Sequence, residues 1–464
     1  MAVGPAPGPA QRGRLRPAGR VLMPTPFRSI ARRARDLSPI TLPLLDRETT
    51  TLPPSEVHRA MRLGVAEGVC TQIHLSLTFG TLATGLALLL GAGSFALGIL
   101  AAMPVIGALM QFPAAWWIER TGERRRLSVI GSLGRQLWLI PAILLFLPFF
   151  GTARLGLFLL ATALGHMLLS MAVNAWTSWM TDLIPAAVRG RYFGARGALM
   201  SGAAMIAAYT GAWWIDYGRT YRFESGAYAV VLIVAAVSGG LGTLLLRRQP
   251  EPPMSAHPRR RMADLLRLPL QNRGFRAFTG TFVLWQIGLG VAAPFFIAYG
   301  LTTLKLPLRT LALMDVVTAL TGLLAQQQWG KLADRIGQRR VLAICMVLIV
   351  PLPWIWLLAR PDRVWPLFFN ATMSGIMWAG FLMTQTNRLM EQAPADGRSA
   401  YFAAFSVATG LPFMFASLAA GSLITVIGLD PLTIAGITFH PYLGFFVLSG
   451  FLRLGALLFG HKAL

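Results

Sequence analysis

The sequence predicts an all-α polytopic membrane protein whose twelve transmembrane helices form two six-helix bundles related by a pseudo-two-fold axis. Three observations lead to this prediction. The 464 residues are 55% hydrophobic and 13% charged, whereas soluble proteins carry roughly 25% charged residues. Apolar runs of about 20 residues, long enough to cross a bilayer core, recur along the chain. Two loop motifs each occur once in either half, in the same order.

The apolar runs predict the positions of the spans. Six lie near 65–90, 94–118, 127–150, 155–178, 196–215 and 226–246, and six near 277–300, 310–329, 340–359, 365–386, 402–427 and 441–459. An Arg-rich polar stretch separates the two sets. The predicted domains are a disordered basic cytoplasmic tail (1–56), an N-terminal bundle (57–247), a cytoplasmic linker (248–274) and a C-terminal bundle (275–464).

The basic residues predict the orientation. Most of the 42 Lys and Arg lie in the tail, in the linker and in the loops 119–126, 182–191, 331–340 and 387–399. Because cytoplasmic loops are enriched in Lys and Arg, we expect these loops and both termini to be cytoplasmic. The bases alternate with apolar runs, so the net charge of +24 indicates a lipid bilayer as partner and no nucleic acid. Heavy use of Arg, Ala, Gly and Leu is typical of a GC-rich bacterial genome, so the expected location is the bacterial inner (plasma) membrane.

The first repeated motif reads GKLADRIGQRR from Gly330 to Arg340, and a weaker copy, AWWIERTGERR, occupies 115–125. Glu119 corresponds to Asp334, 215 positions later, and Gly122 to Gly337 at the same separation. The candidate gating residues are Glu119, Arg120, Gly122, Arg124, Gly330, Asp334, Arg335, Gly337, Arg339 and Arg340.

These residue types suit a cytoplasmic gate. Gly330 would allow close helix packing, and Gly337 a turn with positive φ. An acid at Asp334 or Glu119 can stabilise a neighbouring helix N-terminus, while the arginines pair with acids or lipid headgroups. A topology anchor without a gating role would use the same residues.

The second motif follows the fourth span of each half. Asp182 and Glu391 start the two copies, 209 positions apart, and Tyr-Phe pairs end them. The shared positions are Asp182, Pro185 and Arg189 in the first copy, and Glu391, Pro394 and Arg398 in the second. Two motifs repeated in order indicate that the halves are related.

With these motifs, the chain from about residue 57 resembles the major facilitator superfamily, whose signature G-x-L-A-D-R-x-G-R-R is close to residues 330–340. The segment around 182–194 is similar to bacterial permeases with unassigned substrates. The resemblance implies two bundles that rock about a substrate site near the bilayer midplane, giving alternating access. Span 155–178 lacks the inner basic residue, and span 196–215 the proline-containing pattern, that drug/proton antiporters of this family carry.

Polar residues inside apolar spans are the candidates for substrate or proton binding, because hydrocarbon disfavours them. They are Glu67, Gln72, His74, Arg135, His166, Asn174, Trp176, Trp285, Gln286 and Asp315. Simpler roles remain open for several of them. Glu67 could be an interfacial acid, His74 a packing histidine, and Asn174 a bond between helices.

Arg135 and Asp315 are the most informative of these candidates. Arg135 lies roughly 13 Å into its span, too deep to reach the interface, so we expect it to pair with an acid or an anionic ligand. Asp315 is a carboxylate that proton coupling could use. It could also be an outer acid paired with Arg309 or Lys305.

The sequence therefore predicts a monomeric secondary active transporter for a small solute, with protons as a candidate coupling ion. The alternative is a protein of the same fold that serves as an assembly factor or sensor. We expect no enzymatic activity, cofactor or metal site, because no phosphate loop, zinc spacing or nucleophile elbow occurs. Cys70 and Cys345 lie in apolar runs and are expected in the core.

Overall fold

The structure, a computed structural model, describes residues 1, 4, 52–147, 151, 153–253, 269, 271–393, 398–430, 432–434 and 437–460. Most of the predicted tail (1–56), much of the predicted linker (248–274) and Pro394 lie outside the described residues. The chain from Glu48 onward belongs to one structural unit, and the elements below all lie in it.

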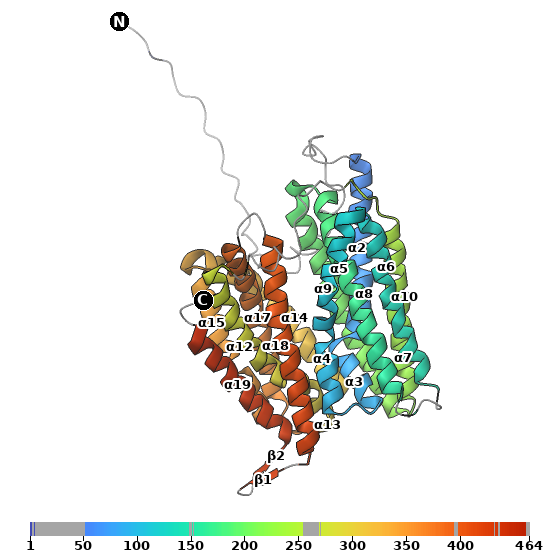
Figure 1. The fold of residues 1–464 in the computed structure, drawn as a ribbon, viewed down its shortest axis with the longest axis vertical. Helices are drawn as coiled ribbons and strands as arrows, with labels where there is room; N and C mark the ends of the chain where they lie inside the picture. Colours follow the sequence, from blue (N-terminus) through green and yellow to red (C-terminus); the bar gives the residue numbers. More distant parts are fainter. Residues whose placement is uncertain are drawn as a thin grey trace. The chain divides into compact units, whose positions relative to one another are not determined.

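The first half of this unit contains six spans, several of them divided into shorter helices (Figure 1). Its elements are α2 (Pro54–Thr78), α3 (Gly80–Leu89), α4 (Ser94–Leu109), α5 (Gln111–Thr121), α6 (Arg124–Ser132), η1 (Leu133–Trp138), α7 (Leu139–Leu144), α8 (Ala153–Leu183), α9 (Ala186–Thr220) and α10 (Glu224–Arg247).

The second half repeats this plan with six further spans (Figure 1). Its helices are α12 (Arg273–Ala292), α13 (Phe295–Thr302), α14 (Leu308–Ile336), α15 (Gln338–Ile349), α16 (Leu352–Ile355), η3 (Trp356–Leu358), α17 (Trp365–Gln392), α18 (Arg398–Ile427) and α19 (Pro441–Gly460). A short antiparallel hairpin, β1 (Leu432–Ile434) and β2 (Ile437–Phe439), precedes α19 and pairs Leu432 with Phe439.

Twelve segments of the described chain are long and apolar enough to cross a membrane, which confirms the predicted spans and the all-α class apart from this hairpin. Most helices extend beyond the predicted ends. The helix α2 begins at Pro54, inside the predicted tail, and α14 continues to Ile336. Apolar runs mark only the part of a helix that matches the hydrocarbon core, while backbone hydrogen bonding continues into the polar interface.

The first span of each half is broken at a corresponding place. In the first half, α2 gives way to α3 at Phe79, and Gly80 has φ +62°, which glycine adopts without a Cβ clash. In the second half, α12 ends before Pro294, whose ring nitrogen has no N–H to donate. These breaks were not predicted. Thr81 and Ala293, which lie next to them, line a cavity, and irregular backbone lines cavities in other membrane proteins as well.

Contacts between the halves involve a small set of helices. Within each half, α2 packs on α9 and α10, and α12 packs on α18 and α19. Across the halves, α4 packs on α18, α9 on α14 and α3 on α13. We call the end with the loops 90–93 and 303–307 and the β1–β2 hairpin the hairpin end. The opposite end, with both repeated motifs, is the motif end.

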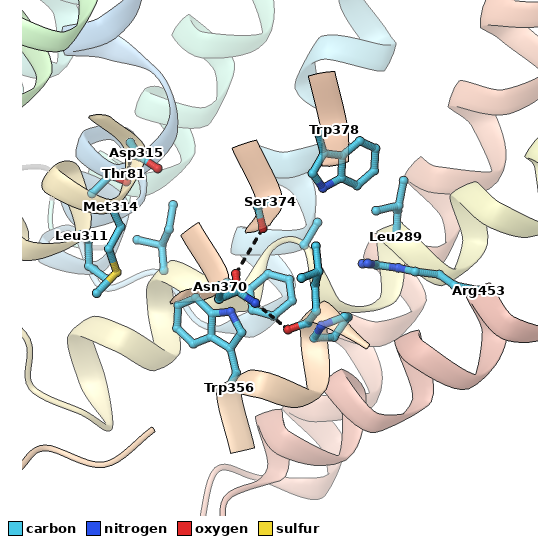
Figure 2. Close-up of a pocket in the computed structure, with 15 residues that line it drawn as sticks. Thr81, Leu289, Leu311, Met314, Asp315, Trp356, Asn370, Ser374, Trp378 and Arg453 are labelled. Carbon is cyan, nitrogen blue, oxygen red and sulfur yellow. Dashed lines mark hydrogen bonds between the residues drawn. The ribbon is translucent and has the colours of Figure 1, made fainter. Parts of the chain in front are cut away.

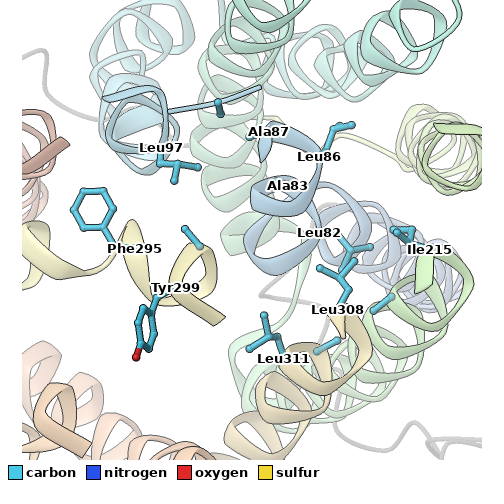
Figure 3. Packing of buried hydrophobic residues seen from close by; sticks show 14 of the residues in the cluster. Leu82, Ala83, Leu86, Ala87, Leu97, Ile215, Phe295, Tyr299, Leu308 and Leu311 are labelled. Atoms are coloured by element: carbon cyan, nitrogen blue, oxygen red, sulfur yellow. The ribbon is translucent and has the colours of Figure 1, made fainter. Parts of the chain in front are cut away.

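A hydrophobic cluster at the hairpin end joins the two halves (Figure 3). It combines Leu82 and Leu86 of α3 and Leu97 of α4 with Phe295 of α13 and Leu308 of α14. By contrast, the cluster around Phe278, Trp285 and Phe381 contains second-half residues, and the cluster around Ile118 contains first-half residues. The shared hydrophobic cluster therefore lies toward the hairpin end.

Candidate functional site

The two repeated motifs of the first half meet at Arg124. This side chain is fully buried at the start of α6, and its guanidinium donates to Asp182 Oδ2 at 2.5 Å. It also donates to the carbonyl oxygens of Ser178 at 3.2 Å and of Pro252 at 2.8 Å. Arg124 thus ties α6 to the end of α8 and to the chain that follows α10.

Arg189 of the second motif caps the C-terminus of α8. Its Nη2 donates to the carbonyl oxygens of Thr181 at 2.6 Å and Ile184 at 3.1 Å, two of the acceptors that a helix end leaves free. Pro185 stands immediately before α9 with φ −56° and ψ 138°, an extended conformation that suits the residue preceding a helix. The motif residues therefore build the α8–α9 turn.

The copy of the first motif in the second half is exposed. Asp334, Arg335, Arg339 and Arg340 all have exposed side chains near the α14–α15 turn. Gly337 has φ +91°, which confirms the predicted positive φ. The prediction of close packing at Gly330 is wrong, because an added Cβ would meet only the Met383 sulfur, at 4.0 Å.

The acids of both motifs also differ from their predicted role. Glu119 is exposed, and the half-buried Asp182 is the acid that pairs with the buried Arg124. Neighbouring Arg120 lies over the Trp116 ring, 4.2 Å from its centroid, and Gly122 ends α5 with φ +70°. In the second half, Glu391 pairs with Arg388. The side chain of Arg398 lies outside what the structure describes.

A buried charge cluster occupies the first half. Glu67 is 3% exposed, and its Oε1 accepts from Arg135 Nη2 at 3.3 Å and from Thr71 Oγ1 at 2.6 Å. Its Oε2 accepts from Arg196 Nη2 at 3.0 Å. The predicted pairing of Arg135 with an acid is confirmed, and the reading of Glu67 as a simple interfacial acid is wrong.

Sequence reasoning missed Arg196, because it stands at the predicted start of a span, where basic residues are common. In the structure α9 begins ten residues earlier, at Ala186, so Arg196 lies well inside the helix. Its Nε donates to the Gly64 carbonyl at 3.0 Å, and its guanidinium lies 4.5 Å from the ring centroid of Trp176. A prediction that starts this helix directly after Pro185 would have placed Arg196 inside the helix.

The other predicted polar residues are dispersed. His74 is fully buried, and its Nδ1 contacts the Ala235 carbonyl at 3.0 Å, as a packing histidine would. His166 stacks on Phe79 with 4.4 Å between ring centroids. Trp285 is buried and stacks on Phe381, 5.5 Å between centroids. Three further candidates are half-buried, namely Gln72, Asn174 and Gln286.

A cavity of about 310 Å³ is lined by residues of both halves (Figure 2). Thr81 of the first half lines it with Asp315, Asn370 and Arg453 of the second. Asp315 Oδ2 accepts a hydrogen bond from Thr81 Oγ1 at 2.6 Å. Among the described ion pairs, none joins Asp315 to Arg309 or Lys305, so the alternative pairing is not observed.

Most residues that line this cavity were not predicted. Asn370 donates to the Leu352 carbonyl at 2.6 Å and accepts from Ser374 Oγ at 3.2 Å, so its amide is held in one orientation. Arg453 is 3% exposed in α19. Arg453 could have been predicted, because it is a single arginine inside an apolar span, as Arg135 is.

Among the described residues, three sets of hydrogen bonds join the halves. Asp216 of α9 accepts from the backbone N–H groups of Leu308 at 2.9 Å and Arg309 at 2.8 Å, at the start of α14. The second is the Thr81–Asp315 bond, and the third joins the hydroxyls of Ser94 and Tyr442 at 3.3 Å. Asp216, Ser94 and Tyr442 lie next to the loops and the hairpin of the hairpin end.

These features define a class: a polytopic helical membrane protein of two six-helix bundles with a cavity lined from both. The sequence matches the profile of the Major Facilitator Superfamily over residues 68–311 and again over 286–461. The chain belongs to this family, as its two motifs predicted.

Solved structures of transporters share the fold. A mutant of the nucleoside transporter NupG is 13% identical, with a TM-score of 0.67 over 87% of this chain and 99% of the other. A D-xylose-proton symporter is 14% identical, with a TM-score of 0.65 over 87% and 97%. A bacterial homologue of the iron transporter ferroportin has the same identity and TM-score, 14% and 0.65, over 87% and 98%. A search of curated proteins found no match to this chain.

Proposed function

We propose that this protein is a secondary active transporter that moves a small solute across the bacterial inner membrane by alternating access. The observation that carries the proposal is the cavity of about 310 Å³, which Thr81 of one half and residues of the other half line together. A binding site at such a boundary changes its exposure when the halves rock. The family and the transporter neighbours support this proposal.

In this proposal, the protein is in an inward-facing conformation. The Arg-rich motif end is the cytoplasmic end under the positive-inside rule, with both termini on that side. The inter-half hydrogen bonds of Asp216 and of Ser94 then close the periplasmic side. For outward opening, the N-terminus of α14 has to separate from Asp216.

Asp315 is the proton-coupling residue of this proposal. Its carboxylate is accessible and lines the cavity, and its described hydrogen bond comes from Thr81 of the other half. Rocking of the halves would break this bond and change the surroundings of the carboxylate. In Glu67, by contrast, both oxygens already contact arginines, so it is less free to exchange a proton with the solute pathway. The likeness to a structure described as a D-xylose-proton symporter is consistent with coupling.

The motif end supplies the cytoplasmic gate in this proposal. Arg124 and Asp182 hold the first-half motif in one rigid piece, whereas Asp334 and its neighbours in the second half are exposed. The exposed charges of the second copy are therefore available to close onto the first half when the periplasmic side opens. Closure would bury groups that are solvated here.

A transport assay tests the proposal. The full-length protein is reconstituted in vesicles containing a pH-sensitive dye, and a panel of sugars, nucleosides, amino acids and organic acids is added. We expect at least one solute to move protons with it. Asp315→Asn should abolish proton movement while solute exchange persists, and the exposed control Asp362→Asn should behave as wild type.

Two outcomes would contradict the proposal. Proton movement by Asp315→Asn at the wild-type rate would exclude Asp315 as the coupling residue. A protein inert to the whole panel, with gradients in either direction, would instead favour the assembly factor or sensor. Asp334→Asn adds a test of the gate, because unchanged transport by this variant would reject its gating role.

A further inference from the structure

The cavity contains a buried arginine that has no carboxylate partner among the residues that the structure describes. Arg453 of α19 is 3% exposed and lines the cavity wall. Its Nε has no hydrogen-bond partner among the described residues. Gly288 provides the space for its side chain, since a Cβ at that position would lie 3.0 Å from Arg453 Cγ. The guanidinium is therefore held within the second half, at the edge of an open volume.

The other two arginines that the described chain buries are paired differently. Arg124, fully buried, has Asp182 at 2.5 Å, and Arg135, 5% exposed, has Glu67 at 3.3 Å. Buried charges in proteins are normally paired, because removal of a charge from water without a counter-charge is costly. Arg453 departs from this rule at the wall of a cavity, where a solute could supply the missing charge.

Asp315 does not take the role of this counter-charge. Figure 2 shows Arg453 and Asp315 at opposite ends of the cavity, with Asn370 and Trp356 between them. The carboxylate of Asp315 accepts its hydrogen bond from Thr81, on the side of the first half. The cavity thus has a cationic end in the second half and an acidic end beside the first.

Aromatic side chains form the walls near the cationic end. Trp378 lines the cavity and packs edge-on against Phe381, 4.9 Å between ring centroids, which in turn stacks on buried Trp285. Phe296 and Trp356 also line the cavity, with 5.0 Å between their ring centroids. Such walls favour a solute with an apolar or planar body attached to its charged group.

We propose that Arg453 binds the anionic group of the transported solute, which is a small organic anion bearing a carboxylate or a phosphate. This inference rests on the proposed transport function and names its substrate class. A guanidinium can donate two parallel hydrogen bonds to either group. The counter-charge that Arg453 lacks within the described part of the chain then arrives with the solute, and Asp315 remains free to carry a proton.

Matched ligands test the anion requirement. The melting temperature of the purified full-length protein is measured with metabolite carboxylates, with phosphate monoesters, and with the neutral amide or alcohol counterpart of each. Benzoate against benzamide and phenyl phosphate against phenol serve as reference pairs. We expect anionic members to raise the melting temperature and their neutral counterparts not to. The pair that responds distinguishes a carboxylate from a phosphate.

Substitutions at Arg453 test the residue. Arg453→Met should weaken anion binding about 10- to 100-fold, as expected for a lost charge-assisted hydrogen-bond pair. Without ligand, this variant should melt at a higher temperature than wild type, because an unpaired buried charge has been removed. Arg453→Lys should retain weak binding, and the exposed control Arg363→Gln should bind as wild type. A purely structural arginine would instead give a less stable Arg453→Met protein.

The proposal is overturned if anions stabilise the protein no more than their neutral counterparts, or if Arg453→Met binds anions as wild type does. These failures are distinguishable from failure of the transport proposal. If the protein transports a neutral solute and Arg453→Met still transports it, the anion-site proposal is rejected and the transport proposal stands. If anions bind through Arg453 but the protein transports none of them, the anion site stands and the transport proposal is rejected.

Discussion

At the scale of single residues, the buried ionic groups have different partners in the two halves. In the first half, Glu67 of α2 pairs with Arg135 of η1 and with Arg196 of α9, so one carboxylate connects three segments. In the second half, Arg453 faces a cavity. A satisfied buried cluster stabilises one arrangement of helices, whereas an unsatisfied buried charge is available for a ligand.

The Glu67 cluster leads to a stability prediction. Glu67→Gln leaves two arginines without their carboxylate and should lower the free energy of unfolding by about 3–5 kcal/mol. Arg135→Met should cost less, because Glu67 keeps its contact with Arg196. Chemical unfolding of the purified protein in detergent measures both effects.

The control for this prediction is an exposed pair in the same half. Glu123 accepts from Arg126 at 2.9 Å, with both side chains largely exposed, so Glu123→Gln should change stability by about 0–1 kcal/mol. Equal losses for Glu67→Gln and Glu123→Gln would mean that the buried cluster contributes no more than a surface pair.

At the scale of elements, helix termini are stabilised by residues far away in the sequence. Arg189 caps the end of α8, and Asp216 of α9 accepts from the first N–H groups of α14 in the other half. A carboxylate at a helix N-terminus satisfies free donors and interacts favourably with the helix dipole. The Asp216 contact therefore contributes to closure of the hairpin end.

Loss of this contact should favour opening of the hairpin end. A helix N-cap contributes about 0.5–2 kcal/mol, so Asp216→Ala should reduce the ratio of closed to open molecules about 2- to 30-fold. Spin labels on Thr220→Cys and Thr302→Cys, in a background without Cys70 and Cys345, measure the distance between the halves. Both label positions are exposed near the hairpin end.

Glu224→Ala is the matched control, since Glu224 pairs with Arg219 of its own half at 2.6 Å. It should leave the distance distribution unchanged. An Asp216→Ala distribution identical to that of wild type would show that the cap does not bias the two states.

The sequence predicted the transmembrane spans better than the breaks within them. All twelve spans follow from apolar runs, yet the break at Phe79 was missed although Gly80 follows it directly. Hydropathy averages over a window as long as the span and is therefore insensitive to one residue that interrupts helical hydrogen bonds. Pro294 was a visible signal for the second break and was not used.

At the scale of the whole molecule, close backbone contact between α4 and α18 holds the hairpin end together. A Cβ at Gly98 would lie 2.6 Å from the Ser417 carbonyl oxygen, and one at Gly421 the same 2.6 Å from the Ser94 carbonyl oxygen. Small residues allow this approach between helices in membranes. One glycine lies in each half, so both halves contribute a small residue to this interface.

Even one methyl group should disturb this interface. Gly421→Ala should shift the label distances between Thr220→Cys and Thr302→Cys to larger values. It should also slow transport, because the proposed cycle needs complete closure of the hairpin end. Gly455→Ala in α19 is the control, since no atom lies within 4 Å of an added Cβ there. Wild-type distances in Gly421→Ala would show that the interface adapts to a side chain.

The sequence by itself determined the class of protein, the twelve spans, the relation of the two halves and the need of an interior Arg135 for an anionic partner. These depend on apolar runs, repeated motifs and the cost of charge in lipid, all of which are local in the chain. The tertiary structure alone decided which acid Arg135 meets, 68 residues away, and that Thr81 and Asp315, 234 residues apart, share a cavity. Those pairings depend on the rotation and packing of each helix, and hydropathy does not encode either one.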